Sequence, residues 1–356
     1  MAGIIDSLDL PTLEWIDMLI EKDVDSLLMD GHTFQDFNDS SITLLGGTGF
    51  IGKWLIEALH VYARNYSFSP KITVITRYPK NAHKIFVEDL GFKLKIIEFN
   101  FAINSTDLGK SDFFINGATP SQNKTGLLDN HSVYKSSVNA SHSLIRSATK
   151  FRNRPKVVNL SSGIVYGPQD VSVRNQTEGP IAKEQPSQSG YLDAKIASEL
   201  LLSEASDTGL VESISPRLYA FAGPGIVLDE HFAVGNFIRD GLQGNQIIIK
   251  GNPSTMRSYM YPTDLVIWIL TALLKPTNLD TNIGSEVPIS MLQLGNLISD
   301  MTSKKGVQIL GENQEISNYV PSTSSFRENY GVSQQITLSS GLERWIEWLL
   351  KSKITQ

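Results

Sequence analysis

The sequence lacks several features that mark particular classes of protein. It contains no cysteine, which excludes a disulfide framework, a thiolate zinc site and a cysteine nucleophile. The longest apolar run, at 265–274, has about half the length that a membrane-spanning helix needs. Asp6 and Asp9 stand where a secretory signal would carry basic residues, so we expect a cytoplasmic protein with no membrane partner. No residue pattern suggests a bound metal.

An excess of positive charge is also missing. The chain has 31 Lys and Arg against 37 Asp and Glu, a formal net charge of -6. This balance argues against nucleic acid as a partner, although a local pocket can still bind a phosphorylated small molecule. With 356 residues, 41% of them hydrophobic and 19% charged, the chain can form one large globular domain or two modest ones.

The order of sequence patterns predicts three segments. Residues 1–40 are expected to form an N-terminal helical extension and linker, because 11–28 has helical spacing and a turn-rich stretch follows. Residues 41–220 alternate short apolar strands with helical patterns, which predicts parallel βαβ units in a doubly wound, Rossmann-like α/β sheet. Residues 221–356 are expected to form mainly a smaller α/β substrate domain, with some segments returning to the first. Ser340 and Glu343 predict a capping box on the last helix.

A glycine-rich stretch, LLGGTGFIGKW at 44–54, connects the first predicted strand to the first helical pattern. Gly46 would allow a tight turn, Gly49 a close approach of backbone N–H groups to a pyrophosphate, and Gly52 close packing of helix on strand. The N-terminus of the helix would then present its unpaired N–H groups to the phosphates. We therefore expect dinucleotide binding here, rather than a tight turn without a ligand.

Two later segments carry a second pattern. YLDAK places Tyr191 and Lys195 four residues apart, so both side chains share one face of a helix. Upstream, VVNLSSGIVYG at 157–167 is an apolar strand that ends in two serines. A phenol is a poor base at neutral pH, but a neighbouring ammonium favours the phenolate. Tyr191 could then exchange a proton with a hydroxyl or carbonyl oxygen of a substrate.

With its G-x-x-G-x-x-G spacing, its serine strand and its Tyr-Lys helix, the chain resembles the extended branch of the short-chain dehydrogenase/reductases, the NAD-dependent epimerase/dehydratase family that acts on nucleotide sugars. The resemblance implies an enzyme with Ser162, Tyr191 and Lys195 as catalytic residues, Ser161 being the less favoured serine. It also implies a nucleoside-diphosphate sugar as substrate and a homodimer. The implied cofactor-binding residues are Gly46, Gly49, Phe50, Ile51, Gly52, Thr76, Arg77, Ala118, Thr119, Tyr191 and Lys195. The implied substrate-binding residues are Ser162, Tyr191, His231, Asn236 and Arg257.

Departures from the family pattern narrow the expected chemistry. NAD-preferring members place an acid where Thr76 stands, whereas Thr76 and Arg77 here suit a 2′-phosphate, so we expect NADP(H) slightly ahead of NAD(H). Gly163 and Ile164 stand where 4,6-dehydratases carry an Asp-Glu pair and where decarboxylases carry a nearby glutamate. Hydride transfer at one sugar carbon, C4, is therefore predicted, as in a 4-ketoreductase or a 4-epimerase. A 4,6-dehydratase that recruits acids from elsewhere, or a non-catalytic dinucleotide-binding regulator, remain the alternatives.

Overall fold

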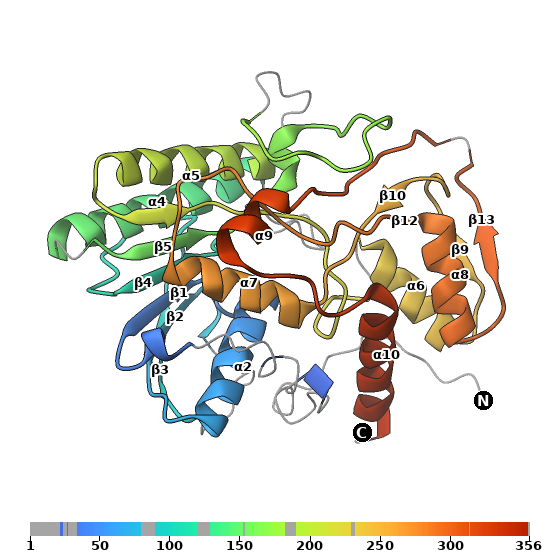
Figure 1. The fold of residues 1–356 in the computed structure, drawn as a ribbon, viewed down its shortest axis with the longest axis horizontal. Helices are drawn as coiled ribbons and strands as arrows, with labels where there is room; N and C mark the ends of the chain where they lie inside the picture. The colour runs from blue at the N-terminus through green and yellow to red at the C-terminus, as the bar shows by residue number, and fades with distance from the viewer. Residues whose placement is uncertain are drawn as a thin grey trace.

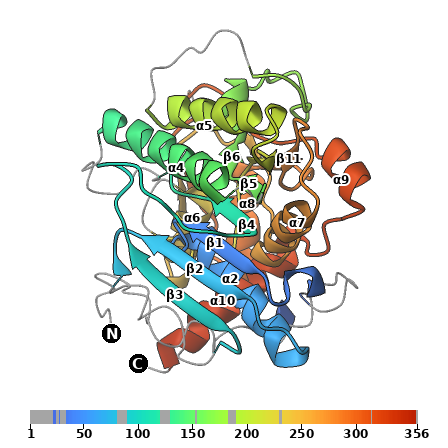
Figure 2. The same cartoon turned by 90° about the vertical axis from the view of Figure 1, so that its left-hand side faces the viewer.

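The structure is a computed structural model that describes residues 22–23, 27, 34–79, 90–119, 129–151, 154–181, 190–228, 232–312 and 314–354. Its centre is a six-stranded sheet in the order β3-β2-β1-β4-β5-β7, in which every neighbouring pair is parallel (Figures 1 and 2). The strands are β1 (Ser41–Leu45), β2 (Lys71–Thr76), β3 (Lys93–Glu98), β4 (Phe113–Asn116), β5 (Lys156–Asn159) and β7 (Glu212–Ile214). This strand order confirms the predicted doubly wound, Rossmann-like fold.

Helices cover both faces of the sheet, which is why its strands read as nearly continuous apolar runs. α4 (Asn130–Phe151) and α5 (Gly190–Asp207) pack together on one face, while α2 (Phe50–Asn65) and α7 (Pro262–Leu274) pack on the other (Figure 1). Successive strand residues alternate between the two cores. Leu44 and Val74 face α2 and α7, whereas Leu45 and Ile75 face α4 and α5.

The longest apolar run of the sequence belongs to α7, which is buried along nearly its whole length. A helix that is hydrophobic all round belongs in the core of a protein or in a membrane. Here it fills the space between the central sheet and the C-terminal segments. Among the helices of the described ranges, none has both the length and the apolarity to cross a bilayer.

The remaining elements form smaller assemblies beside the carboxyl ends of the central strands (Figure 1). A parallel three-stranded sheet, β11-β8-β6, continues from β5, and two-stranded pairs join β10 to β12 and β13 to β9. These strands are β6 (Ser161–Ser162), β8 (Arg217–Leu218), β9 (Ile247–Ile249), β10 (Met256–Arg257), β11 (Asn282–Ile283), β12 (Ile289–Ser290) and β13 (Val307–Ile309). The accompanying helices are η2 (Gly163–Tyr166), α6 (Ala233–Leu242), α8 (Met291–Met301), α9 (Ser324–Tyr330) and α10 (Leu338–Ile354).

Most of the predicted N-terminal extension, 1–40, lies outside the described residues, and the boundaries at 40 and 220 stay predictions. Its described end, including η1 (Gln35–Phe37), packs on the core through aromatic side chains. The ring of Phe34 lies 5.5 Å from that of Tyr62, and the ring of Phe37 lies 4.8 Å from that of Phe113. This segment is therefore part of the folded unit.

The predicted capping box on the last helix is wrong. α10 begins at Leu338, so Ser340 already lies inside the helix. The backbone N–H of Ser340 donates to the side-chain oxygen of Thr337 at 3.3 Å, which makes Thr337 the capping residue. The pattern was misplaced because Thr337 and Ser340 are both suitable caps, and only the packing decides where the helix starts.

Candidate active site

The glycine loop lies between β1 and the N-terminus of α2. Gly46 has φ +79, and a Cβ on it would lie 2.6 Å from the carbonyl oxygen of Gly117 in the neighbouring strand connection. A Cβ on Gly52 would lie 2.3 Å from the carbonyl oxygen of Gly47. The first and third glycines are thus required by the packing of the turn itself.

Gly49 is different, because the fold does not require it. Its φ of -74 and ψ of 174 are extended values that any residue adopts, and a Cβ there would meet only the carbonyl oxygen of Gly46, at 3.4 Å. It is the N-cap of α2 and supplies no side chain to the N–H groups of the first turn. This open, side-chain-free cradle at a helix N-terminus fits the pyrophosphate of a dinucleotide.

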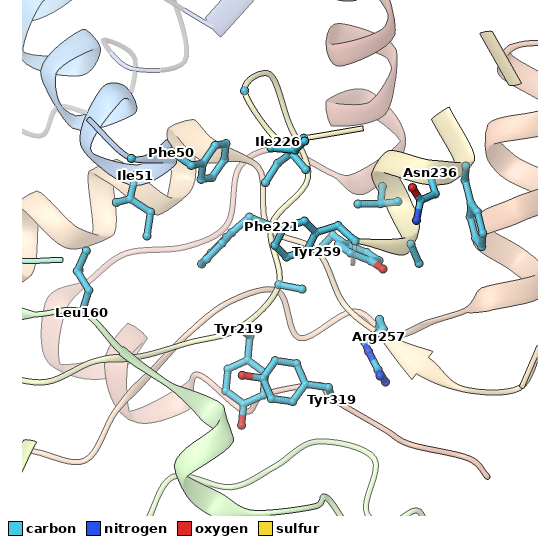
Figure 3. Close-up of a pocket in the computed structure, with 18 of the residues that line it drawn as sticks. Phe50, Ile51, Leu160, Tyr219, Phe221, Ile226, Asn236, Arg257, Tyr259 and Tyr319 are labelled. Carbon is cyan, nitrogen blue, oxygen red and sulfur yellow. The ribbon is translucent and has the colours of Figure 1, made fainter. Parts of the chain in front are cut away.

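A cleft of about 1080 Å³ begins at this loop and runs between the central sheet and the C-terminal elements (Figure 3). Phe50 and Ile51 of α2 lie towards one end and Asn236 of α6 towards the other, with Phe221 and Tyr259 between them. A cleft of this size at the carboxyl ends of parallel strands is the usual ligand site of a doubly wound sheet.

The predicted catalytic residues meet in a smaller cavity of about 200 Å³. It is lined by Ser162, Tyr191 and Lys195, and it shares Ile51, Gly117, Thr119, Leu160, Tyr219, Phe221 and Tyr319 with the wall of the large cleft. The two cavities are therefore neighbours, and the glycine loop and the Tyr-Lys helix face one site.

Within this cavity the side chains are tightly constrained. The ammonium of Lys195 lies 5.4 Å from the ring centroid of Tyr191, one helical turn away on α5, and donates a hydrogen bond to the carbonyl oxygen of Leu160 at 2.5 Å. The hydroxyl oxygen of Ser162 lies 3.3 Å from that of Tyr319. Ser162 also caps the short helix η2 by accepting the N–H of Ile164 at 3.4 Å.

Burial opposes the charged form of both titrating groups. It raises the pKa of the Tyr191 phenol, while the hydrogen bond with Ser162 lowers it. It also lowers the pKa of Lys195 to about 8, against the opposing charge of Glu199. Lys195 thus remains largely protonated at neutral pH, as its predicted role requires, but at a cost to the folded protein.

That cost gives a pH-dependent prediction for stability. Lys195 keeps a pKa near 10.5 when unfolded and about 8 when folded, so the unfolded state binds more protons between these values. Stability from this residue therefore rises with pH across that window and is lowest below it. Between about pH 7.5 and about pH 9.5 we expect wild type to gain about 2 kcal/mol of unfolding free energy relative to Lys195→Met.

Urea unfolding of both proteins at the two pH values measures this difference. Lys110→Met, which changes an exposed loop residue, is the control and should track wild type. Parallel pH dependences in wild type and Lys195→Met would show that burial does not perturb Lys195.

Ser161 and Ser162 differ in their surroundings, although both line the small cavity. The hydroxyl of Ser161 donates to the buried carboxylate of Glu199. Glu199 in turn pairs with Arg217 at 2.9 Å, and Arg217 also pairs with Asp280 at 2.8 Å. The hydroxyl of Ser161 is thus engaged in this ionic network, whereas that of Ser162 contacts the hydroxyl of Tyr319 and the N–H of Ile164.

A scan against protein families matches residues 42–284 to the NAD dependent epimerase/dehydratase family. The chain belongs to this family. A UDP-N-acetyl-alpha-D-glucosaminuronate decarboxylase of Bacillus cytotoxicus is 24% identical over 319 residues, covering 86% of this chain and 96% of that protein.

Solved structures agree on the fold. A UDP-glucose 4-epimerase of Thermotoga maritima bound to UDP-glucose superposes with a TM-score of 0.71 at 20% identity, over 88% of this chain and 99% of that chain. A dTDP-glucose 4,6-dehydratase of Bacillus anthracis in complex with NAD gives a TM-score of 0.70 at 18% identity, over 88% and 97%. The epimerase/dehydratase family is a family of enzymes, so both the predicted resemblance and the predicted enzyme class are confirmed.

Two further residues predicted to bind the cofactor, Thr76 and Arg77, lie beside the glycine loop. The side-chain oxygen of Thr76 is buried, lies 2.8 Å from that of Thr48 and accepts the N–H of Tyr78 at 3.2 Å. Thr76 thus anchors the loop, and its hydroxyl is already engaged. Arg77 is half-buried, with its guanidinium 5.4 Å from the ring centroid of Tyr78.

The fourth-strand residues follow β4. Ala118 accepts a hydrogen bond from Ser136 through its backbone oxygen at 2.9 Å, and Thr119 donates to Ser137 at 3.0 Å. Thr119 lines both cavities, whereas Ala118 packs against the core on the α4 side of the sheet.

The predicted substrate residues are divided between the two cavities, with Ser162 and Tyr191 in the small one. Asn236 and Arg257 both line the large cleft, and Arg257 donates hydrogen bonds to the backbone oxygens of Met256, at 2.9 Å, and of Ser317. His231, which was also predicted to bind the substrate, lies outside the described residues. Within those residues, no group of three or more His, Cys, Asp or Glu side chains could hold a metal ion.

Two tyrosines in the site were not predicted from the sequence. The rings of Tyr219 and Tyr319 stack with their centroids 4.3 Å apart at the boundary of the two cavities (Figure 3). Tyr219 also fills the space beside Gly163, where a Cβ would lie 2.5 Å from its ring. No spacing in the sequence marks Tyr319, because it meets Ser162 only through the folding of the chain.

Proposed function

We propose that this protein transfers hydride at C4 of a nucleoside-diphosphate sugar, as an NAD(P)-dependent 4-ketoreductase or 4-epimerase. The observation that carries the proposal is the small cavity of Ser162, Tyr191 and Lys195, whose walls are shared with the cleft that begins at the glycine loop. Such an arrangement suits a sugar whose reacting carbon lies between a tyrosine hydroxyl and a cofactor held by the loop.

The chemistry assigned to the chain is proton transfer. In reduction, the hydroxyl of Tyr191 gives its proton to the C4 carbonyl oxygen as that carbon gains a hydride. In oxidation, the phenolate takes the C4 hydroxyl proton as the hydride leaves. Ser162 orients the reacting oxygen, and the positive charge of Lys195 stabilises the phenolate. When bound, the nicotinamide cofactor supplies or accepts the hydride; the open face at Gly49 is where its pyrophosphate would be held.

The diphosphate of the sugar nucleotide would bind in the large cleft. Lys53, Arg239, Lys250 and Arg257 line it, although Arg239 already pairs with Asp240 at 2.8 Å. Guanidinium and ammonium groups in a partly buried cleft suit phosphate oxygens. We assign the phosphate contacts to Arg257, and a sugar contact to Asn236.

A decarboxylase is the second candidate, because relatives similar over most of the chain are named as nucleotide-sugar decarboxylases. The space beside Gly163 argues against it. That position carries no acid, and the ring of Tyr219 occupies the volume that a side chain there would need. The same observation argues against a 4,6-dehydratase that uses the family's usual pair of acids.

Chromatography that separates C4 epimers, followed by mass spectrometry of the products, separates these candidates. Purified protein is incubated with NADH or NADPH and UDP-4-keto-hexoses, and separately with UDP-hexoses and a UDP-hexuronate. A product two mass units heavier than a keto substrate indicates a reductase, and a C4 epimer of unchanged mass indicates an epimerase. Loss of carbon dioxide or of water would contradict the proposal, and cofactor binding without any turnover would indicate a regulator.

We further propose that NADP(H) is the preferred cofactor, since no acid ends β2 and Arg77 follows Thr76 there. We expect Arg77→Ala to weaken NADPH binding about tenfold, because a guanidinium that binds a phosphate contributes a charge-assisted hydrogen bond. NADH binding should stay within about twofold of wild type. Titration of the cofactor fluorescence measures both, and equal losses for the two cofactors would remove Arg77 from 2′-phosphate recognition.

The homodimer implied by the resemblance and the cytoplasmic location both stay predictions.

A further inference from the structure

The described part of the N-terminal segment contains a carboxylate that is fully buried. Asp23 is 0% exposed. One of its oxygens accepts a hydrogen bond from the guanidinium of Arg344 at 2.8 Å, and the other accepts one from the hydroxyl of Tyr261 at 2.9 Å. Burial raises the pKa of Asp23, and both partners lower it. The N-terminal segment is thus joined to α10 through Arg344. It is also joined to the start of α7 through Tyr261, the residue that precedes this helix.

Tyr261 continues this connection towards the cleft. Its ring packs edge-on against that of Trp54 of α2, with centroids 6.1 Å apart. The indole N–H of Trp54 donates to the backbone oxygen of Pro224 at 2.9 Å. The next two residues, Gly225 and Ile226, line the large cleft (Figure 3).

The backbone next to Tyr261 supports the same wall. Met260 donates its N–H to the oxygen of Ala220 and accepts that of Ala222, both at 3.1 Å. Ala220 and Phe221 line the cleft, as does Tyr259 on the opposite strand. The space around Tyr261 is also full, since a Cβ on Gly341 would lie 2.7 Å from its ring. Tyr261 therefore cannot shift without moving residues of the cleft wall.

We infer that Asp23 is a positioning residue for the nucleotide-sugar half of the site, acting through Tyr261 and Trp54 on the cleft-lining segment 220–226. The inference rests on the proposed function only in taking a nucleotide sugar as the ligand of this wall. Residue 23 lies before the matched family region of 42–284, and α10 lies after it. Asp23 and Arg344 thus lie outside the matched region, whereas Tyr261 and Trp54 lie within it.

The test uses two variants of the connection and one control in the full-length protein. Asp23→Asn removes the charge while keeping the shape, and Tyr261→Phe removes only the hydroxyl and keeps the ring against Trp54. Asp36→Asn changes an exposed carboxylate in the same segment and should behave as wild type. Three quantities are measured: amide hydrogen exchange without ligand, and the dissociation constants of UDP-glucose and of NAD.

We expect faster exchange in a peptide covering 220–226, where the N–H groups of Ala222 and Ile226 are hydrogen-bonded, and little change in β1 or α4. The dissociation constant of UDP-glucose should rise roughly fivefold in both variants, with that of NAD unchanged. Unchanged exchange at 220–226, or an equal increase across the whole chain, would overturn the inference. So would unchanged UDP-glucose binding alongside a lower melting temperature, which would indicate a purely structural role.

The two proposals can fail separately. If wild type does not bind UDP-glucose or a related UDP-sugar, the proposed substrate class fails, while the exchange of 220–226 still decides whether Asp23 positions this wall. If Asp23→Asn does not fold, Tyr261→Phe carries the test, because it removes one hydroxyl and leaves the ion pair of Asp23 with Arg344 in place.

Discussion

Replacing Tyr191 by phenylalanine lowers kcat by about a thousandfold, because the ring remains but the proton that must reach or leave the sugar oxygen has no carrier. Cofactor affinity stays near that of wild type, since Tyr191 lines the small cavity and its substitution leaves the residues of the large cleft unchanged. Steady-state kinetics with the identified nucleotide sugar, together with a cofactor titration, measure the two effects separately.

Tyr134→Phe is the matched control for this variant. Tyr134 lies on α4, is 40% exposed and lines neither cavity. Its substitution should leave kcat unchanged. If Tyr191→Phe turned over at the rate of this control, Tyr191 would have no part in proton transfer, and the assignments of Lys195 and Ser162 would fall with it.

Adding a methyl group lowers the free energy of unfolding at Gly52 but hardly changes it at Gly49. Gly52→Ala should lower the free energy of unfolding by about 3 kcal/mol, because its Cβ would lie 2.3 Å from the backbone oxygen of Gly47 and both groups are held by the turn. Gly49→Ala should leave that free energy within about 0.5 kcal/mol of wild type, because its Cβ meets only one atom, at an ordinary distance.

Cofactor binding then distinguishes a functional loop from a structural one. Gly49→Ala should weaken cofactor binding by at least about tenfold, because the methyl group would occupy the face that a pyrophosphate approaches. Chemical denaturation and isothermal titration of NAD and NADP measure the two properties on the same samples. Wild-type affinity in a well-folded Gly49→Ala would mean that the dinucleotide does not bind at this helix N-terminus.

The sequence was most informative where local pattern and function coincide. Alternating apolar strands and helices predicted the doubly wound sheet, because a parallel strand buried on both faces has no polar alternation. Gly46 and Gly52 proved to be required by steric contacts that any turn of this shape makes. Tyr191 and Lys195 could be paired from spacing alone, since a helix brings residues four apart together.

The sequence was least informative where the contact partner is distant. Tyr319 reaches Ser162 only because the chain returns after α8, and Asp23 meets Tyr261 and Arg344 across most of the chain. No spacing rule connects such residues. The hydrogen bond between the hydroxyls of Thr76 and Thr48 is a further example, because the two residues belong to different segments and no sequence pattern connects them.

The absorbance of the reduced nicotinamide during a single turnover tests the central claim most directly. The account predicts that mixing the cofactor-loaded protein with its nucleotide sugar, or with the 4-keto form, changes this absorbance in wild type and not in Tyr191→Phe, although both proteins bind both ligands. If wild type loaded with the reduced cofactor converted the 4-keto sugar to product with no loss of this absorbance, hydride transfer beside Tyr191 would be contradicted.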